Sequence, residues 1–486
     1  MEDKITSWFN HLYRKSYALY VIANIFAGLF LFGSLVAIIV VTIFSYLEEK
    51  KSALSIFGEI FVNTIASIVG VLLAYFLYRF LFLVGHHNED KNKVSYSNAD
   101  MWKQYGTEYR HQFTLHDNHN FTVYFEKLLK KGEFTSLKIM DDPNDYFSLD
   151  PFIKNHFFFD LNDAHVMSET TNSVTVRLKE VIPADANGVA TIKTMRSTYL
   201  SHLLTNRALD YELKTGVTIR SLFENTNHLV PLQRSRFSNH LGVNALVFLQ
   251  NGVLLLPERG KHATVAKEKV TASIATRIKM ENKNIFKNTY VDELTDNYIT
   301  EGCIKDSIAG SIKVDAQWLQ EKSEQKDFMK IDFLGLSRDI YEGGKPTLFY
   351  AVYLNLPAKE YLIERSRHLE KQKKDRKIRK RKNRDGYIYK EPESIDEVKT
   401  IHLVKWDSIT MCQYFTTEEE TKQNKEDNEN YYQKELDKGL LSFSRYIVPE
   451  KDEDIPDSID KMKTSTRQKA FEQNLIANFW FYKNCQ

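Results

Sequence analysis

Two long apolar stretches dominate the hydrophobic pattern at the N-terminal end of the chain. Residues 17–47 contain no charged side chain, and residues 54–84 contain only Glu59 near their start and Arg79 near their end. As helices, the two stretches would each be about 45 Å long at 1.5 Å per residue, which exceeds the thickness of a hydrocarbon core. This pattern predicts a two-helix transmembrane hairpin over residues 1–86.

The flanks of this predicted hairpin carry an excess of Lys and Arg, which predicts that both termini face the cytoplasm. The basic residues that flank it are Lys4, Arg14, Lys15, Lys91, Lys93, Lys103 and Arg110. The rest of the chain is then expected to form a cytosolic body attached to this two-span hairpin.

The second predicted span carries small residues at every fourth position, namely Ala66, Gly70 and Ala74. Small residues at this spacing allow close helix contact and predict an interface between spans. Asn63 and Glu59 lie on or near the same side. Glu59 is a functional candidate because an ionisable group within a span is costly. In the alternative interpretation, it sits at the membrane surface and anchors the turn.

The pattern after the hairpin changes to shorter elements and predicts an α+β body in two parts. Residues 87–237 are expected to form a juxtamembrane linker and a lead-in region. In this region, residues 174–182 alternate as a strand and residues 190–195 pair with it across a turn. Residues 197–209 have the apolar spacing of a helix.

Residues 238–486 are expected to form a second domain, a mixed sheet with helices. Two apolar runs meet at Asn251-Gly252, which is a hairpin signal, and residues 269–279 alternate as a third strand. Residues 330–356 give two further strands around a Gly-Gly-Lys-Pro turn. An amphipathic helix is expected over residues 465–482. The predicted fold class is therefore α+β with an N-terminal transmembrane hairpin.

Composition adds limits to this picture. A chain of 486 residues with 13% aromatic residues should contain more than one folding unit with substantial cores. Cys303, Cys412 and Cys485 lie far apart and form no CxxC pair. This spacing argues against a zinc site or a disulfide scaffold.

Basic residues beside predicted turns are the candidates for phosphate binding. Arg338 can hold a phosphate bidentately and Lys345 can add a point charge beside Asp339. Arg259 and Lys261 follow the second strand of the predicted hairpin. The alternative for both groups is an ordinary surface turn or strand end without a ligand.

The stretch at residues 301–324 resembles the Nudix signature, in which carboxylates hold divalent metal for pyrophosphate hydrolysis. Gly302, Trp318 and Glu321 agree with the Nudix spacing, whereas Gln317 and Gln320 occupy glutamate positions. An amide does not supply the negative charge that a hard cation needs. The resemblance, which extends over residues 238–356, therefore implies a degenerate box that binds a phosphorylated ligand without cutting it.

A transmembrane hairpin joined to a degenerate Nudix-like body resembles the two-transmembrane Nudix-like effectors of cyclic-oligonucleotide antiphage signalling (CBASS). The resemblance implies a location in the bacterial inner membrane, in contact with its lipids. It implies a cyclic di- or trinucleotide ligand made by a partner nucleotidyltransferase, with Tyr341 or Phe349 under a base. Ligand binding would drive homo-oligomerisation and disruption of the membrane, which arrests growth. No catalytic residue, metal or further cofactor is implied.

Two alternatives remain open at this point. One is a membrane-tethered Nudix hydrolase of nucleoside diphosphate derivatives, with Glu321 and Glu324 on one helix face and Asp306 or Asp315 beside them. The other is a constitutive membrane scaffold without a small ligand.

A basic insertion is expected at residues 361–390. Residues 361–384 contain 12 Lys or Arg and three acidic residues. Such a run is typical of a solvated helix face, and anionic lipid or RNA are alternative partners. The acidic stretch at residues 418–437 is a further partner of opposite charge, within one chain or between copies.

Overall fold

The computed structural model describes most of the chain after residue 103. The described residues are 104–115, 120–153, 173–210, 217–224, 226–260, 268–278, 280, 283–284, 289–290, 294–382, 398–411, 440–447, 454–456 and 459–486. The predicted lead-in region and the predicted Nudix-like region contribute to one compact unit.

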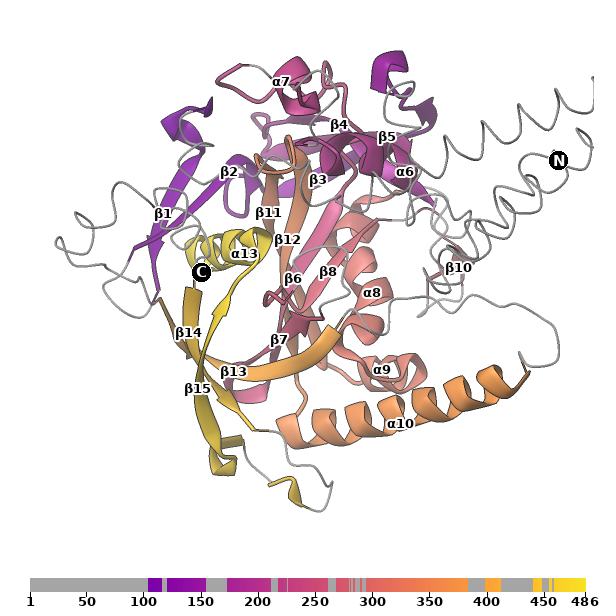
Figure 1. The fold of residues 1–486 in the computed structure, drawn as a ribbon, viewed down its shortest axis with the longest axis vertical. Helices are drawn as coiled ribbons and strands as arrows, with labels where there is room; N and C mark the ends of the chain where they lie inside the picture. The colour runs from indigo at the N-terminus through magenta and orange to yellow at the C-terminus, as the bar shows by residue number, and fades with distance from the viewer. Residues whose placement is uncertain are drawn as a thin grey trace, which may run out of the picture. The chain divides into compact units, whose positions relative to one another are not determined.

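A mixed sheet of ten strands lies at the centre of this unit (Figure 1). Its neighbouring strands are antiparallel except for β12 and β6, which run parallel. In spatial order, the sheet consists of β1 (Arg110–Thr114), β2 (Asn120–Lys130), β11 (Met329–Asp339), β12 (Lys345–Leu354), β6 (Gly242–Leu249), β7 (Val253–Arg259), β13 (Val398–Met411), β14 (Leu440–Tyr446) and β15 (Thr464–Ala470), with β8 (Ile274–Arg277) paired to β6.

The central strand β6 is buried along its whole length because both faces of the sheet are covered. Val243, Ala245 and Val247 point into one hydrophobic core, whereas Leu246 and Phe248 point into a second core on the opposite face. The sequence of a strand that is buried on both faces is a continuous run of apolar residues. This explains why residues 242–249 show no alternation of polar and apolar positions.

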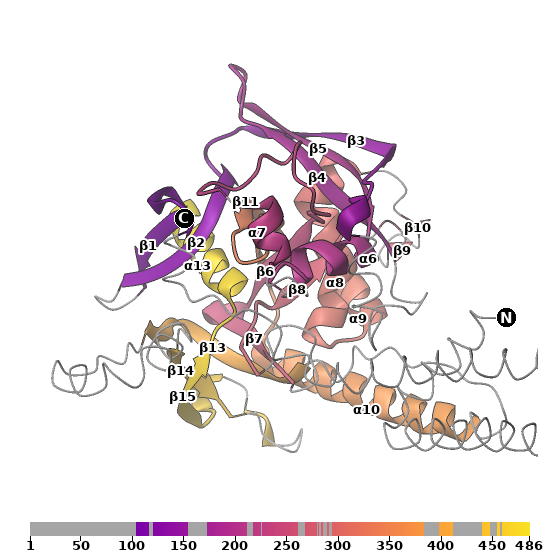
Figure 2. The ribbon, with the colours of Figure 1, turned by 45° about the horizontal axis from the view of Figure 1, so that its top comes forward.

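Helices cover the two faces of the sheet. α8 (Cys303–Ile312), α9 (Ala316–Ser323) and the start of α10 (Ala358–Lys382) supply side chains to the first core. α13 (Gln473–Cys485) supplies side chains to the second core. Figures 1 and 2 show α8 and α13 on opposite sides of β6 and β12.

Smaller elements surround the central sheet. β3 (Ser136–Tyr146), β5 (Val189–Thr198) and β4 (Val174–Ile182) form a three-stranded sheet, and β10 (Thr289–Tyr290) pairs with β9 (Lys283–Asn284). The short helices are α6 (Tyr199–His202), α7 (Ile219–Phe223), the 3-10 turns η2 (Thr107–Tyr109), η4 (Gln250–Gly252) and η9 (Ile459–Lys461), and the π-helical turns η3 (Leu203–Arg207) and η5 (Tyr298–Gly302).

The hairpin signals in the sequence are confirmed. Asn251 adopts a left-handed conformation with φ of 60° between β6 and β7. β4 pairs antiparallel with β5 across the expected turn. The helix expected over residues 465–482 is wrong at its start, because Thr464–Ala470 forms strand β15 against β14 and the helix begins at Gln473.

The predicted fold class is corrected in its membrane part. The described residues form a mixed α/β fold, and none of their helices is both long and apolar enough to cross a membrane. The longest of them, α10, has 25 residues and is rich in Lys and Arg, which are costly to bury in hydrocarbon. The expected transmembrane hairpin and the inner-membrane location derived from it are therefore not retained. Residues 1–86, on which that expectation rested, lie outside the described residues.

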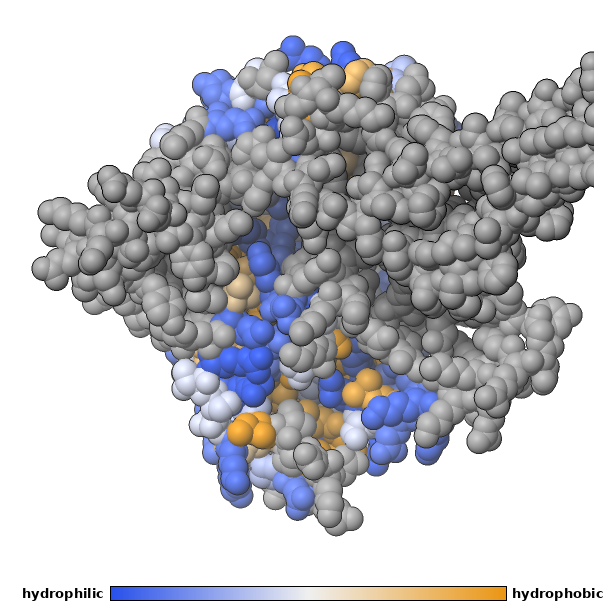
Figure 3. All heavy atoms as spheres, viewed as in Figure 1, coloured by the Kyte–Doolittle hydropathy of each residue, from blue (hydrophilic) through white to orange (hydrophobic). Residues whose placement is uncertain are grey.

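The space-filling view shows the same face as Figure 1. Figure 3 shows hydrophilic residues around the lower end of the described surface, with smaller hydrophobic patches between them. The large hydrophobic side chains that are exposed include Met140, Ile182 and Ile447. Exposed apolar residues are ordinary on protein surfaces and do not by themselves indicate a partner.

Candidate functional site

Arg338, at the turn between β11 and β12, was predicted to bind phosphate, but its side chain is hydrogen-bonded within the protein. The Arg338 side chain is 2% exposed. Its Nη1 donates to Glu126 Oε2 at 2.7 Å, its Nη2 to the Val230 carbonyl at 2.8 Å and its Nε to the Gly344 carbonyl at 3.1 Å. Arg338 therefore joins β11 to β2 and to a distant loop, and its guanidinium faces protein acceptors.

Gly344 is required beside this arginine. It has a φ of +80°, and a Cβ at this position would lie 2.4 Å from Arg338 Nη2. Gly344 thus leaves room for the buried guanidinium, rather than for an external ligand, whereas Gly343 lies against Leu209 and Phe237.

The remaining residues predicted at this turn are also held by protein groups. Lys345 Nζ lies 2.6 Å from Glu342 Oε2, and Arg207 Nη1 lies 2.6 Å from Glu342 Oε1. Burial and the neighbouring Glu342 carboxylate raise the pKa of Asp339, and Asp339 Oδ1 accepts the Tyr341 backbone N–H at 2.8 Å.

The two predicted base-stacking residues do not form an open platform. Tyr341 is half-buried, and its carbonyl accepts from Arg220 Nη2 at 2.7 Å. Phe349 is fully buried in the second core and stacks on Phe481 with ring centroids 4.8 Å apart. The turn therefore brings its predicted residues close together, but their side chains contact other parts of the protein instead of forming an open ligand site.

Arg259 ends β7, where it pairs with Val398 of β13 and is partly buried. Lys261 lies outside the described residues. The preceding residue, Glu258, has a buried carboxylate 2.9 Å from His402 Nε2 and 3.2 Å from Lys469 Nζ. This cluster ties β15 to the central strands.

The predicted degenerate box divides between two helices. Gly302 has helical φ and ψ where η5 continues into α8, so it does not open a loop. Gln317, Gln320 and Glu321 all lie on α9, where Gln317 Nε2 donates to Glu321 Oε1 at 3.1 Å. The box residues are therefore not arranged around one loop, but α9 presents part of them to a groove.

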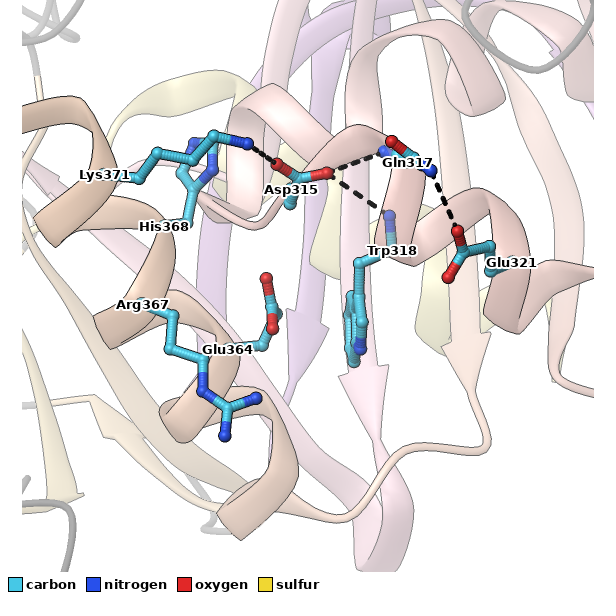
Figure 4. Close-up of a pocket in the computed structure, with 8 residues that line it drawn as sticks. All are labelled: Asp315, Gln317, Trp318, Glu321, Glu364, Arg367, His368 and Lys371. Carbon is cyan, nitrogen blue, oxygen red and sulfur yellow. Dashed lines mark hydrogen bonds and ion pairs between the residues drawn. The ribbon is translucent and has the colours of Figure 1, made fainter. Parts of the chain in front are cut away.

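A groove of about 280 Å³ lies between α9 and α10 and is named here the α9–α10 groove (Figure 4). It is lined by Asp315, Gln317, Trp318, Glu321, Glu364, Arg367, His368 and Lys371. Basic side chains from α10 thus face the stretch that the sequence singled out on α9.

Asp315 fixes the start of α9 and also contacts α10. As the N-cap residue, its Oδ1 accepts the backbone N–H groups of Gln317 at 3.0 Å and Trp318 at 3.3 Å. Its Oδ2 accepts from Lys371 Nζ at 3.0 Å. Partial burial acts to raise the pKa of Asp315, but these hydrogen bonds hold it below the ordinary value.

On the α10 side of the groove, the buried carboxylate of Glu364 lies near the exposed guanidinium of Arg367. Glu364 is 9% exposed, and burial raises its pKa. Arg367 is exposed, and no hydrogen bond of its guanidinium is found among the described residues. Burial lowers the pKa of His368, which favours its neutral form.

Two contacts fix the spacing of the groove walls. Tyr361 is buried, and its hydroxyl donates to the Ile312 carbonyl at 3.1 Å, which anchors the first turn of α10 to α8. Lys322 Nζ lies 2.6 Å from Glu360 Oε1 and connects α9 to α10 directly. The groove is therefore defined by packing and is not a gap between independent helices.

Sequence reasoning did not identify Glu364, Arg367, His368 and Lys371 individually as site residues. The available signal was the basic run at residues 361–384, which the structure confirms as helical up to Lys382. The predicted interface residues of the second span, Glu59, Asn63, Ala66, Gly70 and Ala74, lie outside the described residues.

In the part of the chain that the structure describes, no group of three or more His, Cys, Asp or Glu side chains is arranged to hold a metal ion. No model of a known protein family matches this chain, and no curated protein matches it significantly.

Proposed function

We propose that the α9–α10 groove binds one nucleotide unit of a signalling ligand, and that the protein acts by sensing this ligand. The observation that carries the proposal is the placement of the Trp318 indole and the Arg367 guanidinium in one 280 Å³ groove. The family resemblance supplies the ligand class, a cyclic di- or trinucleotide made by a partner nucleotidyltransferase in antiphage signalling.

The indole of Trp318 supports stacking of a base. It is half-buried on α9, packs against the first core, and its backbone N–H is fixed by Asp315. An aromatic ring that is already held in place loses little conformational freedom when a ligand stacks on it. Stacking of a base on an aromatic side chain contributes about 1–3 kcal/mol.

Arg367 supports binding of a phosphate. An arginine can donate two parallel hydrogen bonds to phosphate oxygens. Unlike Arg338, which donates to three acceptors of the protein, Arg367 is exposed at the groove. The Lys371 ammonium lies at the same groove, where Asp315 holds it. The positive charge at the groove is thus supplied by α10.

The size of the groove sets how much of the ligand it can hold. Pockets for drug-sized molecules have volumes of about 300–1,000 Å³, so a groove of 280 Å³ suits one nucleotide unit. The other units of a cyclic ligand would then lie outside this groove.

Binding without cleavage is supported by the residues on α9. Gln317 and Gln320 stand where the hydrolase spacing has glutamates, and neutral amides are poor ligands for a hard divalent cation. We include self-association of ligand-bound copies in the proposal. The ligand drives that step only if it binds the assembled state more tightly than the single chain.

The experiment is a calorimetric titration of the purified full-length chain with a panel of cyclic di- and trinucleotides. At least one member should bind saturably, and Arg367→Ala should weaken its binding about tenfold or more because a charge-assisted bond to phosphate is lost. Lys373→Ala is the matched control. Lys373 is exposed on α10 about 200° around the helix axis from Lys371 and does not line the groove.

Two results would contradict the proposal. One is that no member of the panel binds to the wild-type chain. The other is that Arg367→Ala binds the ligand as tightly as Lys373→Ala does. Light scattering of the same samples tests whether saturation with ligand increases the mass of the particles.

A further inference from the structure

The side of the Trp318 indole that faces α10 carries a buried acceptor beside an exposed cation. Figure 4 shows Glu364 and Arg367 on this side and Glu321 on the other side of the ring. We propose that the α9–α10 groove selects a guanine base, whose Watson–Crick edge donates to the Glu364 carboxylate while its ring stacks on Trp318. This inference rests on the proposed function and names the ligand of the same groove.

Glu364 is suited to reading a base edge because it is fixed and shielded from water. It is 9% exposed on α10, in the stretch anchored by Tyr361. Burial and the nearby Asp315 carboxylate raise the pKa of Glu364, whereas the Arg367 guanidinium and the Asp315 backbone N–H act in the opposite direction and favour its ionised form. A buried carboxylate that a ligand fails to hydrogen-bond is costly, so it discriminates strongly between ligands.

The chemistry of an ionised carboxylate determines which base fits. Its two oxygens only accept hydrogen bonds. Guanine presents two adjacent donors, N1–H and the 2-amino group, which match both oxygens. Adenine presents one donor beside the N1 acceptor, and cytosine presents one donor beside the N3 acceptor, so a lone pair would face a carboxylate oxygen. Uracil presents a single N3–H donor between two carbonyl groups.

The other groove residues are consistent with this assignment. Glu321 already accepts from Gln317 Nε2 at 3.1 Å, and Asp315 accepts from Lys371 and from the first turn of α9. Glu364 accepts the backbone N–H of Asp315, but neither a lysine nor an amide side chain is found hydrogen-bonded to it among the described residues. Of the three carboxylates at the groove, Glu364 is therefore the one that a base edge would satisfy.

The test compares binding of cyclic di-GMP and cyclic di-AMP to the full-length chain by calorimetry. A bidentate pair to a base edge gives about 5- to 150-fold discrimination, and the wild-type chain should prefer cyclic di-GMP within that range. Glu364→Gln should abolish or reverse this preference, because an amide presents one donor and one acceptor and suits adenine. Glu370→Gln, an exposed change on the same helix outside the groove, should preserve it.

A second measurement needs no variant. Cyclic di-IMP lacks the 2-amino groups of cyclic di-GMP and keeps the same ring and N1–H. It should bind the wild-type chain more weakly than cyclic di-GMP, by about fivefold or more. Equal binding of the two ligands would overturn the assignment even if Glu364→Gln failed to fold.

The remaining outcomes separate this inference from the proposed function. Equal or tighter binding of cyclic di-AMP, or binding of cyclic di-UMP alone, would overturn guanine selection and leave nucleotide sensing in place. Loss of the preference in Glu321→Gln, with Glu364→Gln unchanged, would overturn the role of Glu364. If none of these ligands binds and the wider cyclic-nucleotide panel also fails, the proposed function itself is wrong.

Discussion

Lys371 Nζ lies 3.0 Å from Asp315 Oδ2, and this contact links the middle of α10 to the residue that caps α9. The carboxylate of Asp315 therefore accepts hydrogen bonds from both helices that form the α9–α10 groove. Loss of the cap should affect α9 more than loss of the exposed ammonium affects α10, because N-cap bonds are worth about 0.5–2 kcal/mol and exposed ion pairs about 0–1 kcal/mol.

Asp315→Ala is accordingly predicted to destabilise the first turn of α9 by about 1–2 kcal/mol. Hydrogen exchange at the backbone N–H groups of Gln317 and Trp318 measures this, because both donate to Asp315 in the folded protein. Asp315→Asn keeps a capping oxygen and should change this exchange little, and Lys371→Ala should have a similarly small effect. Faster exchange in Lys371→Ala than in Asp315→Ala would contradict this order.

Arg338→Ala is predicted to destabilise the protein by about 3–5 kcal/mol, because it removes a buried guanidinium that donates to Glu126 and to the Val230 and Gly344 carbonyls. The measurement is the shift of the thermal unfolding midpoint. Lys330→Ala on the same strand removes a side chain that is 70% exposed and should shift the midpoint little. The prediction would be contradicted if Arg338→Ala unfolded at the same temperature as the wild type but no longer bound nucleotide. That result would indicate that Arg338 binds phosphate.

Glu224 makes the stability of the protein depend on pH. Burial raises its pKa from 4.5 to about 7, and its Oε1 has no hydrogen-bond partner among the described residues. Between pH 4.5 and pH 7 the folded protein keeps a proton that the unfolded chain has released, so this contribution to stability is lost as pH rises through that window.

Glu224→Gln should remove this contribution. Relative to the wild type, the variant is predicted to gain about 2–3 kcal/mol in the free energy of unfolding between pH 5 and pH 8. Glu370→Gln, which removes an exposed carboxylate, should show no such trend. Chemical unfolding curves recorded at several pH values measure the difference. A constant difference across the range would show that Glu224 titrates normally.

Trp318 should report ligand binding through its fluorescence. A base stacked on the indole is expected to quench it, and Trp318→Phe should remove most of the change that saturating nucleotide causes in the wild type. The chain has five tryptophans, so a control is needed. Trp480 packs against the second core on the opposite face of the sheet, and Trp480→Phe should leave the quenching intact. Equal loss of quenching in both variants would contradict stacking on Trp318.

Local sequence signals predicted the elements whose structure depends on nearby residues. The β6–β7 and β11–β12 turns followed from Asn251-Gly252 and Gly343-Gly344, where positive φ values are needed. The helix expected at residues 465–482 failed at its first part because Thr464–Ala470 pairs with β14 along its whole length. Tertiary pairing overrode the local pattern there.

The site residues were less predictable because their roles depend on distant partners. Arg338 resembled a phosphate ligand in a turn, but its acceptors Glu126 and Val230 lie 212 and 108 residues away in sequence. The α9–α10 groove similarly requires α10 to fold back across α9, as the Lys371–Asp315 contact over 56 residues shows. The basic run indicated charge, but only packing reveals that Arg367 and Lys371 line the same groove as Trp318.

The most direct test of nucleotide binding in the α9–α10 groove is a crystal structure of the full-length chain saturated with the cyclic nucleotide that binds it most tightly. The account predicts one base stacked on the α10-facing side of Trp318 and a phosphate within hydrogen-bonding distance of Arg367. A well-ordered nucleotide bound elsewhere on the protein, with the groove between α9 and α10 empty, would contradict it.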